Sequence, residues 1–457
     1  MVKGRRLKDF SVEGLRVTVV GAARSGIAAA LLLADRGARV TVSESRAEVA
    51  ESESLETRGI ALELGGHRTG TFAGADLVVL SPGVPPELPP IAVARNRGVP
   101  VIGEVELASR WLKGRMIAIT GTKGKSTTTV LTGRMLERAG FHVTVGGNIG
   151  APLCGQVAAS TAESLHVVEA SSFQLEQIDT FRPWIAVMLN FSPDHLDRHP
   201  SVATYGAAKA RIFENQDERD WAVINADDPA VLDLAKSARA RRRVFGRCAP
   251  VLDGTALEAG WIVDRRDEGT ERLLPLSAIH LLGPHLVDDV MAAATVGAIV
   301  GVAPEVMTGA VEGFEGLEHA MELVAEIDGV RFVNDSKATN VESAKRSIES
   351  FDTQVVPIVG GRFKGGDLGL LREPLRQRAR ALVAMGESRG LMRDAFGDVL
   401  PTVEAGSLEE AVRRAFELAK PGGVVLLAPA CASFDMFRDY AERGQRFKEA
   451  VRRLKEA

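Results

Sequence analysis

Short apolar runs alternate with longer amphipathic stretches through most of this chain. Residues 15–21 form a β-branched run that ends in glycine, residues 27–37 an alanine- and leucine-rich stretch, and residues 38–45 a second β-branched run. Such short runs predict buried strands, and the longer stretch between them predicts a helix that ends at Gly37. Because strands that alternate with helices pair in parallel, the segment is predicted to be a βαβ arrangement, with another strand at 75–85.

The alternation starts afresh twice, so the pattern predicts an α/β fold with three domains, at residues 1–106, 107–316 and 317–457. Residues 241–282 hold short β-like pieces without a long helix, and we expect a meander or hairpin excursion there. Further strands are predicted at 116–120, 164–170, 184–190, 222–229, 330–336, 355–361, 381–386 and 423–430. Further helices are predicted at 285–301, 343–351, 408–420 and 439–454.

Composition excludes several classes of protein. The chain has 457 residues, of which 45% are hydrophobic and 25% charged, values that are ordinary for globular proteins. Lysine and arginine number 56 against 60 acidic residues, which argues against a nucleic-acid or membrane-surface partner. The cysteines Cys154, Cys248 and Cys431 are too far apart for a disulfide framework or a zinc site. The sequence shows no signal-peptide core and no membrane-length apolar run, so we expect a cytoplasmic protein without membrane insertion.

The motif GTKGKST at residues 121–127 is typical of a nucleotide phosphate site. Its glycines let backbone N–H groups turn toward phosphate oxygens, its lysines add positive charge, and the hydroxyl of Ser126 can ligate Mg²⁺. A predicted strand precedes the motif and a predicted helix follows it, although the spacing between the first two glycines is shorter than in the usual phosphate loop. An unrelated GxxGKS in a loop is the weaker alternative.

A second glycine turn, GAARSG at residues 21–26, stands where a dinucleotide fingerprint would stand. Ala23 replaces its middle glycine and would hinder the close approach of a pyrophosphate, so NAD is a poor fit. A nucleotide diphosphate held loosely at the helix N-terminus fits better, and Glu44 could accept hydrogen bonds from ribose hydroxyls. A plain turn between strand and helix is nearly as good an interpretation.

Polar side chains follow two predicted strands of the second segment. Glu169 ends one strand, and Asp194 and His195 follow another. Because the carboxyl ends of parallel strands face the ligand crevice, a carboxylate and an imidazole there could hold Mg²⁺ beside a nucleotide. Helix capping by Asp194 and a solvated loop around His195 are the alternatives. Lys209, taken by itself, looks like an exposed helix lysine.

Three polar turns follow strands of the third segment: residues 334–340 (NDSKATN), 360–367 (GGRFKGGD) and 429–437 (PACASFDMF). Each alone could be ordinary turn chemistry. Three such turns at the strand ends of one domain suggest a site for a small anionic ligand.

Together these motifs resemble the Mur ligase family of peptidoglycan synthesis, and most closely its D-glutamate-adding branch. The similarity spans essentially the whole chain, since GTKGKST, VVEASSFQLE, NFSPDHLDRHP, NDSKATN and PACASFD follow in the family's order. NDSKATN separates this branch from relatives that add other amino acids. The resemblance implies a Rossmann-like UDP-binding domain, a central P-loop-type ATPase domain and a C-terminal Rossmann-like domain. We also expect a monomer.

The resemblance further implies roles for matching positions. The UDP-sugar would be held by Ser25, Glu44, Ser45, Arg46, Gly83 and Asn148. ATP would be held by Gly121, Thr122, Lys123, Gly124, Lys125, Ser126, Thr127, Asp289, Asp335 and Lys337. D-Glutamate would be held by Thr339, Lys364, Ser433 and the backbone near Tyr440. One Mg²⁺ would be held by Ser126 and Glu169 and a second by His195 and a carbamylated Lys209, with Lys125, His195 and Lys209 as the catalytic residues.

Two positions depart from the family's pattern. Where the family shows an asparagine pair in GxHNxxN, this chain has Leu286 and Asp289, and an aspartate can accept from adenine N6 but cannot donate to N7. Where the family shows HRxE, this chain has HAME, so Ala320 replaces an arginine expected near ATP.

The resemblance implies an ATP-dependent acid–amino-acid ligase that adds D-glutamate to UDP-N-acetylmuramoyl-L-alanine through an acyl phosphate. A folylpolyglutamate synthase-like ligase or another Mur-type ligase shares the ATPase core, but the folylpolyglutamate type leaves the first segment with GAARSG unexplained. An NAD-dependent oxidoreductase would use that first segment alone. The departures at Ala320 and Leu286 keep open a nucleotide-binding protein with impaired catalysis.

Overall fold

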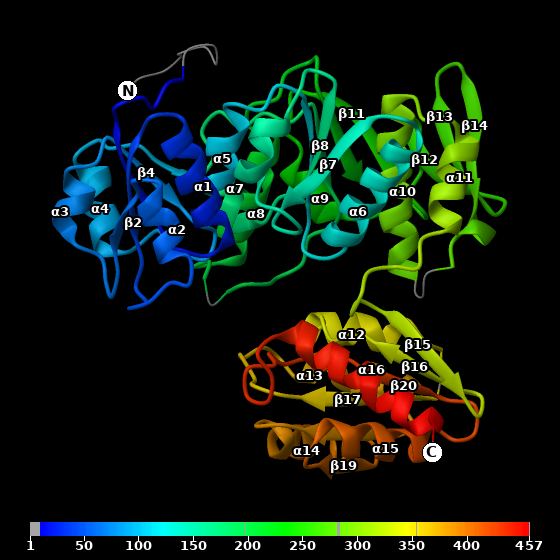
Figure 1. Cartoon of the computed structure of the whole chain (residues 1–457). Helices are drawn as coiled ribbons and strands as arrows, with labels where there is room; N and C mark the ends of the chain where they lie inside the picture. The colour runs from blue at the N-terminus through cyan, green and yellow to red at the C-terminus, as the bar shows by residue number, and fades with distance from the viewer. Residues whose placement is uncertain (1–9, 197, 281–283, 353, 457) are drawn as a thin grey trace. The chain divides into compact units, whose positions relative to one another are not determined.

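The chain folds into three β-sheets that are flanked by helices (Figure 1). The computed structural model describes residues 10–196, 198–280, 284–352 and 354–456. Most strand pairs in the described ranges are parallel, which confirms the predicted α/β class.

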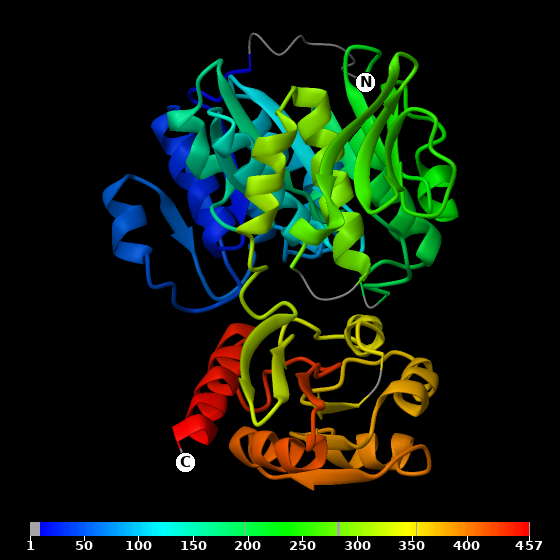
Figure 2. The same ribbon diagram turned by 90° about the vertical axis from the view of Figure 1, so that its right-hand side faces the viewer.

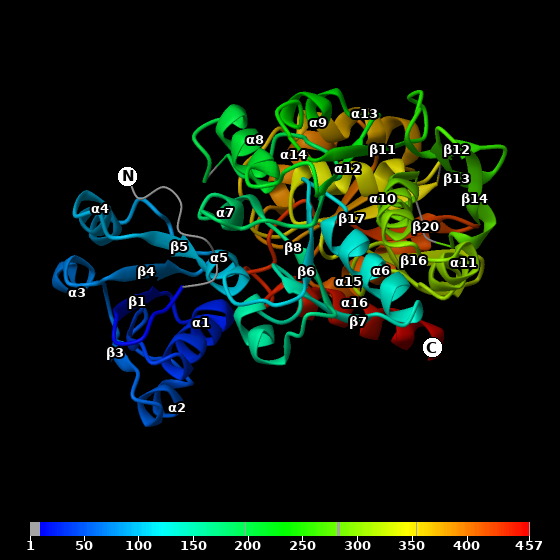
Figure 3. The ribbon, with the colours of Figure 1, turned by 90° about the horizontal axis from the view of Figure 1, so that it is seen from above.

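The first sheet has the strand order β3-β2-β1-β4-β5, and all of its neighbours pair in parallel. Its strands are β1 Arg16–Val20, β2 Arg39–Ser43, β3 Ala61–Glu63, β4 Leu77–Leu80 and β5 Val101–Gly103. Its helices are α1 Arg24–Asp35, α2 Ser52–Thr57, α3 Thr69–Ala73, α4 Pro89–Asn96 and α5 Glu104–Ser109. Figure 3 shows α1 on one side of the sheet and α3 and α4 on the other. Val19 packs on the α1 side and Val20 on the α3 side, so β1 is buried on both faces, which explains its unbroken apolar run.

The second sheet has the order β14-β13-β12-β11-β10-β9-β6-β8-β7. Its strands are β6 Arg115–Thr120, β7 His142–Gly147, β8 Ser164–Glu169, β9 Ile185–Met188, β10 Trp221–Asn225, β11 Arg241–Gly246, β12 Gly254–Glu258, β13 Trp261–Arg266 and β14 Gly269–Pro275. Its helices are α6 Lys125–Arg138, η2 Leu153–Ala159, α7 Ser172–Leu175, α8 Val202–Ala210, η3 Arg211–Phe213, α9 Pro229–Leu234, η4 Leu276–Ala278, α10 Pro284–Val300 and α11 Pro304–Glu312. Strands β12, β13 and β14 pair antiparallel, which confirms the expected excursion. They extend the parallel sheet at its edge, because β11 pairs with β12 in parallel.

The third sheet has the order β15-β16-β20-β17-β18-β19. Among the strand pairs of this sheet that the structure describes, β15 and β16 are antiparallel and the others are parallel. Its strands are β15 Glu322–Ile327, β16 Val330–Asn334, β17 Val355–Gly360, β18 Leu382–Met385, β19 Thr402–Ala405 and β20 Val424–Leu427. Its helices are α12 Val341–Glu349, α13 Gly369–Arg378, α14 Arg389–Phe396, α15 Leu408–Ala419 and α16 Tyr440–Glu456. Figure 2 shows α16, in red, and α12, in yellow, on opposite sides of these strands, and each helix packs with its own apolar cluster.

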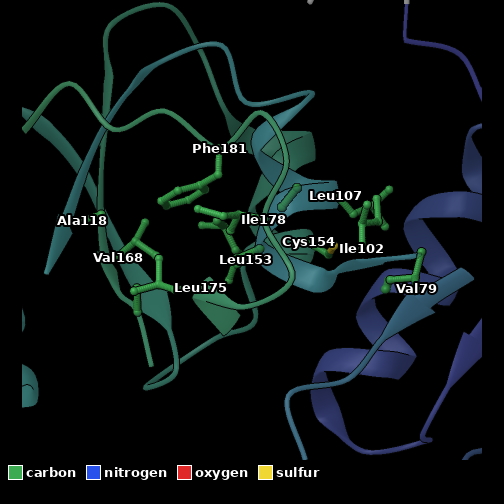
Figure 4. Packing of buried hydrophobic residues seen from close by; sticks show 14 of the residues in the cluster. Val79, Ile102, Leu107, Ala118, Leu153, Cys154, Val168, Leu175, Ile178 and Phe181 are labelled. Carbon is green, nitrogen blue, oxygen red and sulfur yellow. The ribbon is translucent and has the colours of Figure 1, made fainter. Parts of the chain in front are cut away.

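By their internal contacts the residues fall into two compact units, Met1–Ala278 with Asp288–Glu312, and Ile279–Val287 with Gly313–Ala457. The first two sheets share the first unit because one apolar core runs through both. Figure 4 shows this core, in which Val79 and Ile102 of the first sheet lie in the same cluster as Leu107, Leu153 and Phe181. The division into three domains at residues 106 and 316 stays a prediction. None of the helices in the described ranges is long and apolar enough to cross a membrane.

Candidate active site

The phosphate loop joins β6 to α6 and owes its path to two glycines. Gly121 and Gly124 have φ values of 154° and 80°, a region that favours glycine. The Asn190 side chain holds the loop from below, because it accepts from the backbone N–H of Lys123 at 2.9 Å and donates to the Lys123 carbonyl at 3.0 Å. Nζ of Lys125 donates to the Thr122 carbonyl at 3.0 Å. The loop therefore stands at a helix N-terminus with its cationic side chains beside it, as phosphate binding requires.

Asp289, expected to contact ATP, lies against this loop. A Cβ built on Gly124 would be 2.0 Å from its Oδ1, and the residue is buried, with 3% of its surface exposed. The structure thus places Asp289 beside the phosphate end of the site. Leu286, the other departure in the same motif, is buried as well.

Glu169 ends β8, which pairs directly with β6, so its side chain and the phosphate loop share one edge of the sheet. Its Oε1 accepts from Nδ2 of Asn148 at 2.7 Å. Its Oε2 is buried, and none of the residues that the structure describes donates a hydrogen bond to it. A buried carboxylate oxygen without a donor is destabilised unless something positive reaches it. This oxygen fits a ligand for Mg²⁺, which prefers oxygen donors.

Lys209 is not the exposed lysine that its local sequence suggests. It lies on α8 with 1% of its surface exposed, and its Nζ donates to the Gly121 carbonyl at 2.6 Å. Burial, and then the neighbouring charge of Lys125, hold the pKa of Lys209 well below its usual range. Burial of this kind favours the neutral amine, which is the form that carbamylation by CO₂ requires.

His195 lies near the same groups. Its backbone φ is 54°, an uncommon value for a residue other than glycine. Burial lowers the pKa of His195, and the charge of Lys125 lowers it further against the opposing effect of Asp194. A neutral imidazole can act as an acceptor or a metal ligand. Asp194 itself pairs with Lys123 at 3.2 Å.

Within the described ranges, no cluster of three or more histidine, cysteine, aspartate or glutamate side chains gathers as a metal site. The expected pairs, Ser126 with Glu169 and His195 with carbamylated Lys209, would not form such a cluster, because each has one of these residues. The expected metal sites therefore depend on ligands from a nucleotide, from water and from a modified lysine.

A cavity of about 700 Å³ lies in the first unit, between the first sheet and the end of β7. Its lining brings together all six residues expected to hold the UDP-sugar: Ser25, Glu44, Ser45, Arg46, Gly83 and Asn148. The lining also includes His67, Arg24 and Gln174, which the sequence motifs did not single out. Asn148 connects this cavity to Glu169, so the cavity leads to the edge of the sheet that carries the phosphate loop.

Glu44 lies in the wall of this cavity, but both oxygens of its carboxylate already accept hydrogen bonds from the chain. Oε2 accepts from the Ala22 N–H at 2.7 Å and from Nη2 of Arg46 at 3.3 Å. Oε1 accepts from the Ser45 hydroxyl and the Arg46 N–H, both at 3.0 Å. Burial alone would raise the pKa of Glu44, but these hydrogen bonds lower it from 4.5 to about 2. The structure thus shows Glu44 organising the glycine turn, where the sequence suggested an acceptor for ribose.

The three polar turns of the third sheet follow β16, β20 and β17, which are neighbours in that sheet. Hydrogen bonds join the turns to one another. The Ala430 N–H donates to the Ala338 carbonyl at 3.0 Å, and Arg362 and Ala432 exchange backbone hydrogen bonds at 2.9 and 3.0 Å. The expected amino-acid residues Thr339, Lys364 and Ser433 lie on these three joined turns. The structure therefore supports one composite site in the second unit.

Arg443 of α16 stabilises the turns of the composite site through hydrogen bonds. Its side chain, with 1% of the residue exposed, donates to the Ser336 hydroxyl at 3.0 Å, the Ser336 carbonyl at 2.8 Å and the Cys431 carbonyl at 3.1 Å. The Tyr440 carbonyl accepts from the Ser336 hydroxyl at 2.7 Å, which ties the expected backbone near Tyr440 to the same turns.

Asp335 and Lys337, expected near the nucleotide, lie in the first of these turns. Asp335 is buried, and its carboxylate accepts from the Ser347 hydroxyl and from the Met321 N–H. The Lys337 N–H donates to the His319 carbonyl at 3.1 Å.

The HAME segment packs inside the second unit. The backbone N–H of His319 donates to Glu322 at 2.9 Å, and the Nδ1 of His319 lies 2.9 Å from the amide nitrogen of Asn334. Lys448 of α16 pairs with Glu322 at 2.6 Å. The histidine and the glutamate of this motif thus brace the start of the third sheet, and Ala320 lies between them on the chain.

Each of the three sheets lies in a region that matches a known domain family. Residues 15–103 match the description "Mur ligase MurD-like, N-terminal domain", residues 119–297 match "Mur ligase middle domain", and residues 320–431 match "Mur ligase, glutamate ligase domain".

Curated relatives match the chain over nearly its whole length. A UDP-N-acetylmuramoylalanine–D-glutamate ligase of Acidobacterium capsulatum is 47% identical over 97% of this chain and 97% of its own. Ligases of the same name from Pelobacter propionicus and Koribacter versatilis are 46% and 44% identical, over 96% and 98% of this chain and 99% of their own lengths.

Solved structures share the fold at lower identity. The UDP-N-acetylmuramate–alanine ligase of Thermotoga maritima has a TM-score of 0.60 at 20% identity, and the match covers 96% of this chain and 100% of that one. The MurF ligase of Thermotoga maritima, solved in complex with ADP, has a TM-score of 0.59 at 17% identity, covering 97% of this chain and 96% of that one. These two comparisons bear on the fold alone.

Proposed function

Since this chain belongs to the Mur ligase family, we propose that it joins D-glutamate to UDP-N-acetylmuramoyl-L-alanine at the expense of ATP. The observation that carries the proposal is the identity of 47% to a UDP-N-acetylmuramoylalanine–D-glutamate ligase across 97% of both chains. The cavity, the phosphate loop and the composite site supply the three binding sites that such a reaction needs. We place the reaction in the cytoplasm, in the synthesis of peptidoglycan precursors, and the active protein is proposed to be a monomer.

The cavity is the proposed site of the UDP-sugar. Ser45, Gly83 and Asn148 line it, and the glycine turn that Glu44 holds forms part of its wall. Because Asn148 also donates to Glu169, a substrate in the cavity would have one end near the proposed metal ligand. That end is where the alanyl carboxylate has to react.

The phosphate loop is the proposed site of ATP. Backbone N–H groups of Gly121–Thr127 would surround the phosphates, and Lys125 would neutralise charge that builds up during phosphoryl transfer. The alanyl carboxylate attacks the γ-phosphorus, which releases ADP and leaves an acyl phosphate. The amine of D-glutamate then attacks the acyl carbon, loses a proton and expels inorganic phosphate, so that one amide bond forms for each ATP cleaved.

Mg²⁺ is the proposed metal, held by Ser126 and Glu169 at one position and by His195 and Lys209 at a second. When bound, it would supply positive charge at the phosphate oxygens. Lys209 would contribute as a carbamate, because Mg²⁺ prefers oxygen ligands to an amine nitrogen. The burial of its amine, which lowers the pKa and favours the neutral form, supports this modification.

The composite site of the third sheet is the proposed site of D-glutamate, with Thr339, Lys364 and Ser433 on its three turns. Lys364 would supply positive charge for a carboxylate of the ligand, and the turns would supply backbone donors. We also propose that the three sheets correspond to three domains, at residues 1–106, 107–316 and 317–457.

Phosphate release from ATP tests this function. We expect release to require UDP-N-acetylmuramoyl-L-alanine and D-glutamate together, with one amide formed for each phosphate. Leaving out either substrate is the matched control, and L-glutamate in place of D-glutamate tests the stereochemistry. A rate of phosphate release that is the same with and without the two substrates would contradict the proposal and favour a nucleotide-binding protein without ligase activity.

A further inference from the structure

His67 lies in the wall of the 700 Å³ cavity, on the turn that follows β3, and the family motifs assign it no role here. Its Nδ1 lies 2.9 Å from the hydroxyl of Ser43, the last residue of β2. Its ring also meets Phe72 edge-on, with the ring centroids 6.1 Å apart. Two neighbours thus hold the imidazole in one orientation at the cavity wall.

The position of the proton on His67 follows from its partners. The Ser43 hydroxyl donates to Oε1 of Glu63 at 2.9 Å, and a carboxylate can only accept. Burial would raise the pKa of Glu63, but hydrogen bonds from the Arg68 N–H, Thr71 and Ser43 lower it overall, so Glu63 is ionised. Since Ser43 has one proton and gives it to Glu63, its oxygen must accept from His67, and Nδ1 of His67 therefore carries hydrogen.

In a neutral imidazole with hydrogen on Nδ1, Nε2 is an acceptor. No residue in the described ranges hydrogen-bonds to Nε2 of His67. Glu44, the other candidate acceptor of this wall, already receives four hydrogen bonds, two on each oxygen. A carboxylate has about four acceptor positions, so Glu44 has none left for a ligand.

We propose that Nε2 of His67 accepts a hydrogen bond from the uridine of the bound substrate and thereby contributes to its recognition. The inference rests on the proposed function, in that the cavity takes a uridine diphosphate group. Two groups of uridine could donate, the imide N3–H of uracil and the 2′-hydroxyl of ribose. Cytosine differs in the relevant way, because its N3 is an acceptor and would face the lone pair of Nε2.

Binding of free nucleotides to the full-length protein tests this inference without any turnover. The probes are UDP, CDP and 2′-deoxy-UDP, titrated by calorimetry at one mildly alkaline pH. We expect the wild type to bind UDP at least about tenfold more tightly than CDP if N3–H is the donor, or than 2′-deoxy-UDP if the ribose is the donor. His67→Phe keeps a ring of similar size but has no acceptor, and it should reduce that ratio to near one.

Three further variants separate recognition from folding. His67→Gln can restore an acceptor and should recover part of the ratio. Ser43→Ala removes the partner that fixes the proton and should also reduce the ratio while His67 stays in place. His142→Phe is the matched control, because His142 contacts the Ser164 hydroxyl through Nδ1 at 3.1 Å but does not line the cavity. It should leave every ratio unchanged.

The outcomes distinguish the inference from the proposed function. If UDP binds and the ratios are the same in the wild type and His67→Phe, the inference is overturned while the proposed function stands. If UDP does not bind to the wild type, both fail. A loss of UDP, CDP and 2′-deoxy-UDP affinity by equal factors in His67→Phe would also overturn the inference, because it would show that His67 only shapes the wall.

Discussion

The wall of the cavity and the edge of the second sheet both contain buried charged groups, but they treat them in opposite ways. At the cavity wall, every oxygen of Glu44 receives hydrogen bonds from the chain, and the pKa of that carboxyl falls to about 2. At the sheet edge, Oε2 of Glu169 has no donor among the described residues, and Lys209 is buried beside another lysine with its pKa held low.

This difference indicates two kinds of preorganisation. The charges of the cavity wall are neutralised within the protein, so they fix the shape of the turn and leave recognition to other groups. The charges of the sheet edge remain incompletely neutralised until a ligand binds. A polyphosphate with its cation would supply the missing opposite charges. Substitutions at the wall should therefore reduce stability, whereas substitutions at the sheet edge should reduce activity.

The largest expected effect is that of Lys125→Ala at the sheet edge. Removing one positively charged contact to developing charge should slow phosphate release by at least about 100-fold. The free energy of unfolding should stay within about 0.5 kcal/mol of the wild type, because the side chain serves the ligand more than the fold. Lys113→Ala, at an exposed lysine next to the same strand, is the control and should change neither quantity.

Lys209→Ala should come next, with a loss of about 100-fold in turnover, because the proposed carbamate ligand disappears. Short-chain carboxylates such as acetate should restore part of the activity by placing an oxygen ligand in the vacated space. The exposed Lys236, changed to alanine, should neither lose activity nor respond to acetate. Full turnover by Lys209→Ala would show that the second metal position does not involve this residue.

Gly124→Ala should raise the KM for ATP about tenfold or more, because its new Cβ would lie 2.0 Å from Oδ1 of Asp289 and would displace one of the two. Gly140→Ala is a matched control. Gly140 has a φ of 87°, close to the 80° of Gly124, but a Cβ there would meet nothing within 4 Å. It should reduce stability by about 1 kcal/mol and leave the KM for ATP unchanged. Equal effects of the two variants would mean that backbone strain alone matters.

Glu44→Gln should have its main effect on the fold. An amide at this position turns a donor toward groups that already donate, and we expect a loss of about 1–3 kcal/mol in the free energy of unfolding. The KM for the UDP-sugar should rise with it, while the KM for ATP stays unchanged. Glu48→Gln, at an exposed position in the next turn, should stay within about 0.5 kcal/mol of the wild type.

The smallest effect is a pH dependence that Glu44 confers. Because its pKa is lower in the folded protein than its ordinary 4.5, the unfolded chain binds the proton more tightly. The stability that Glu44 contributes is therefore fully present above about pH 4.5 and is lost as the pH falls toward 2. Urea unfolding of the wild type and Glu44→Gln at several pH values should show their difference shrinking over this window. A difference that does not change with pH would contradict the role given to the Glu44 charge.

Much of the fold could be predicted from the sequence because its longer elements are strongly periodic. The strands β1, β6, β8 and β17 and the helices α10 and α15 lie where the apolar pattern placed them. The pattern missed β3, β5 and α2, which have three to six residues each and are too short to show a period. It also missed β15, whose outward positions leave it only half-buried at the edge of the third sheet.

The candidate site could be predicted where its residues are contiguous in sequence. The phosphate loop is one such stretch, and its strand and helix context is confirmed. His67 could not be found in this way, because its meaning depends on Ser43 and Glu63, which come together only through the pairing of β2 with β3. The burial of Lys209 could not be predicted from the sequence either, because the packing of α8 against the phosphate loop arises from the tertiary structure. The donors that occupy Glu44 likewise come from both sides of the glycine turn.

The difference between the cavity wall and the sheet edge is tested most directly by measuring the free energy of unfolding and the rate of D-glutamate-dependent phosphate release on the same preparations of Glu44→Gln and Lys125→Ala. We predict a crossed result: Glu44→Gln loses at least about 1 kcal/mol of stability and keeps its kcat, whereas Lys125→Ala keeps its stability and loses at least about 100-fold in turnover. Parallel losses of stability and turnover in both variants would contradict it, because the two regions would then not differ in how they use their buried charge.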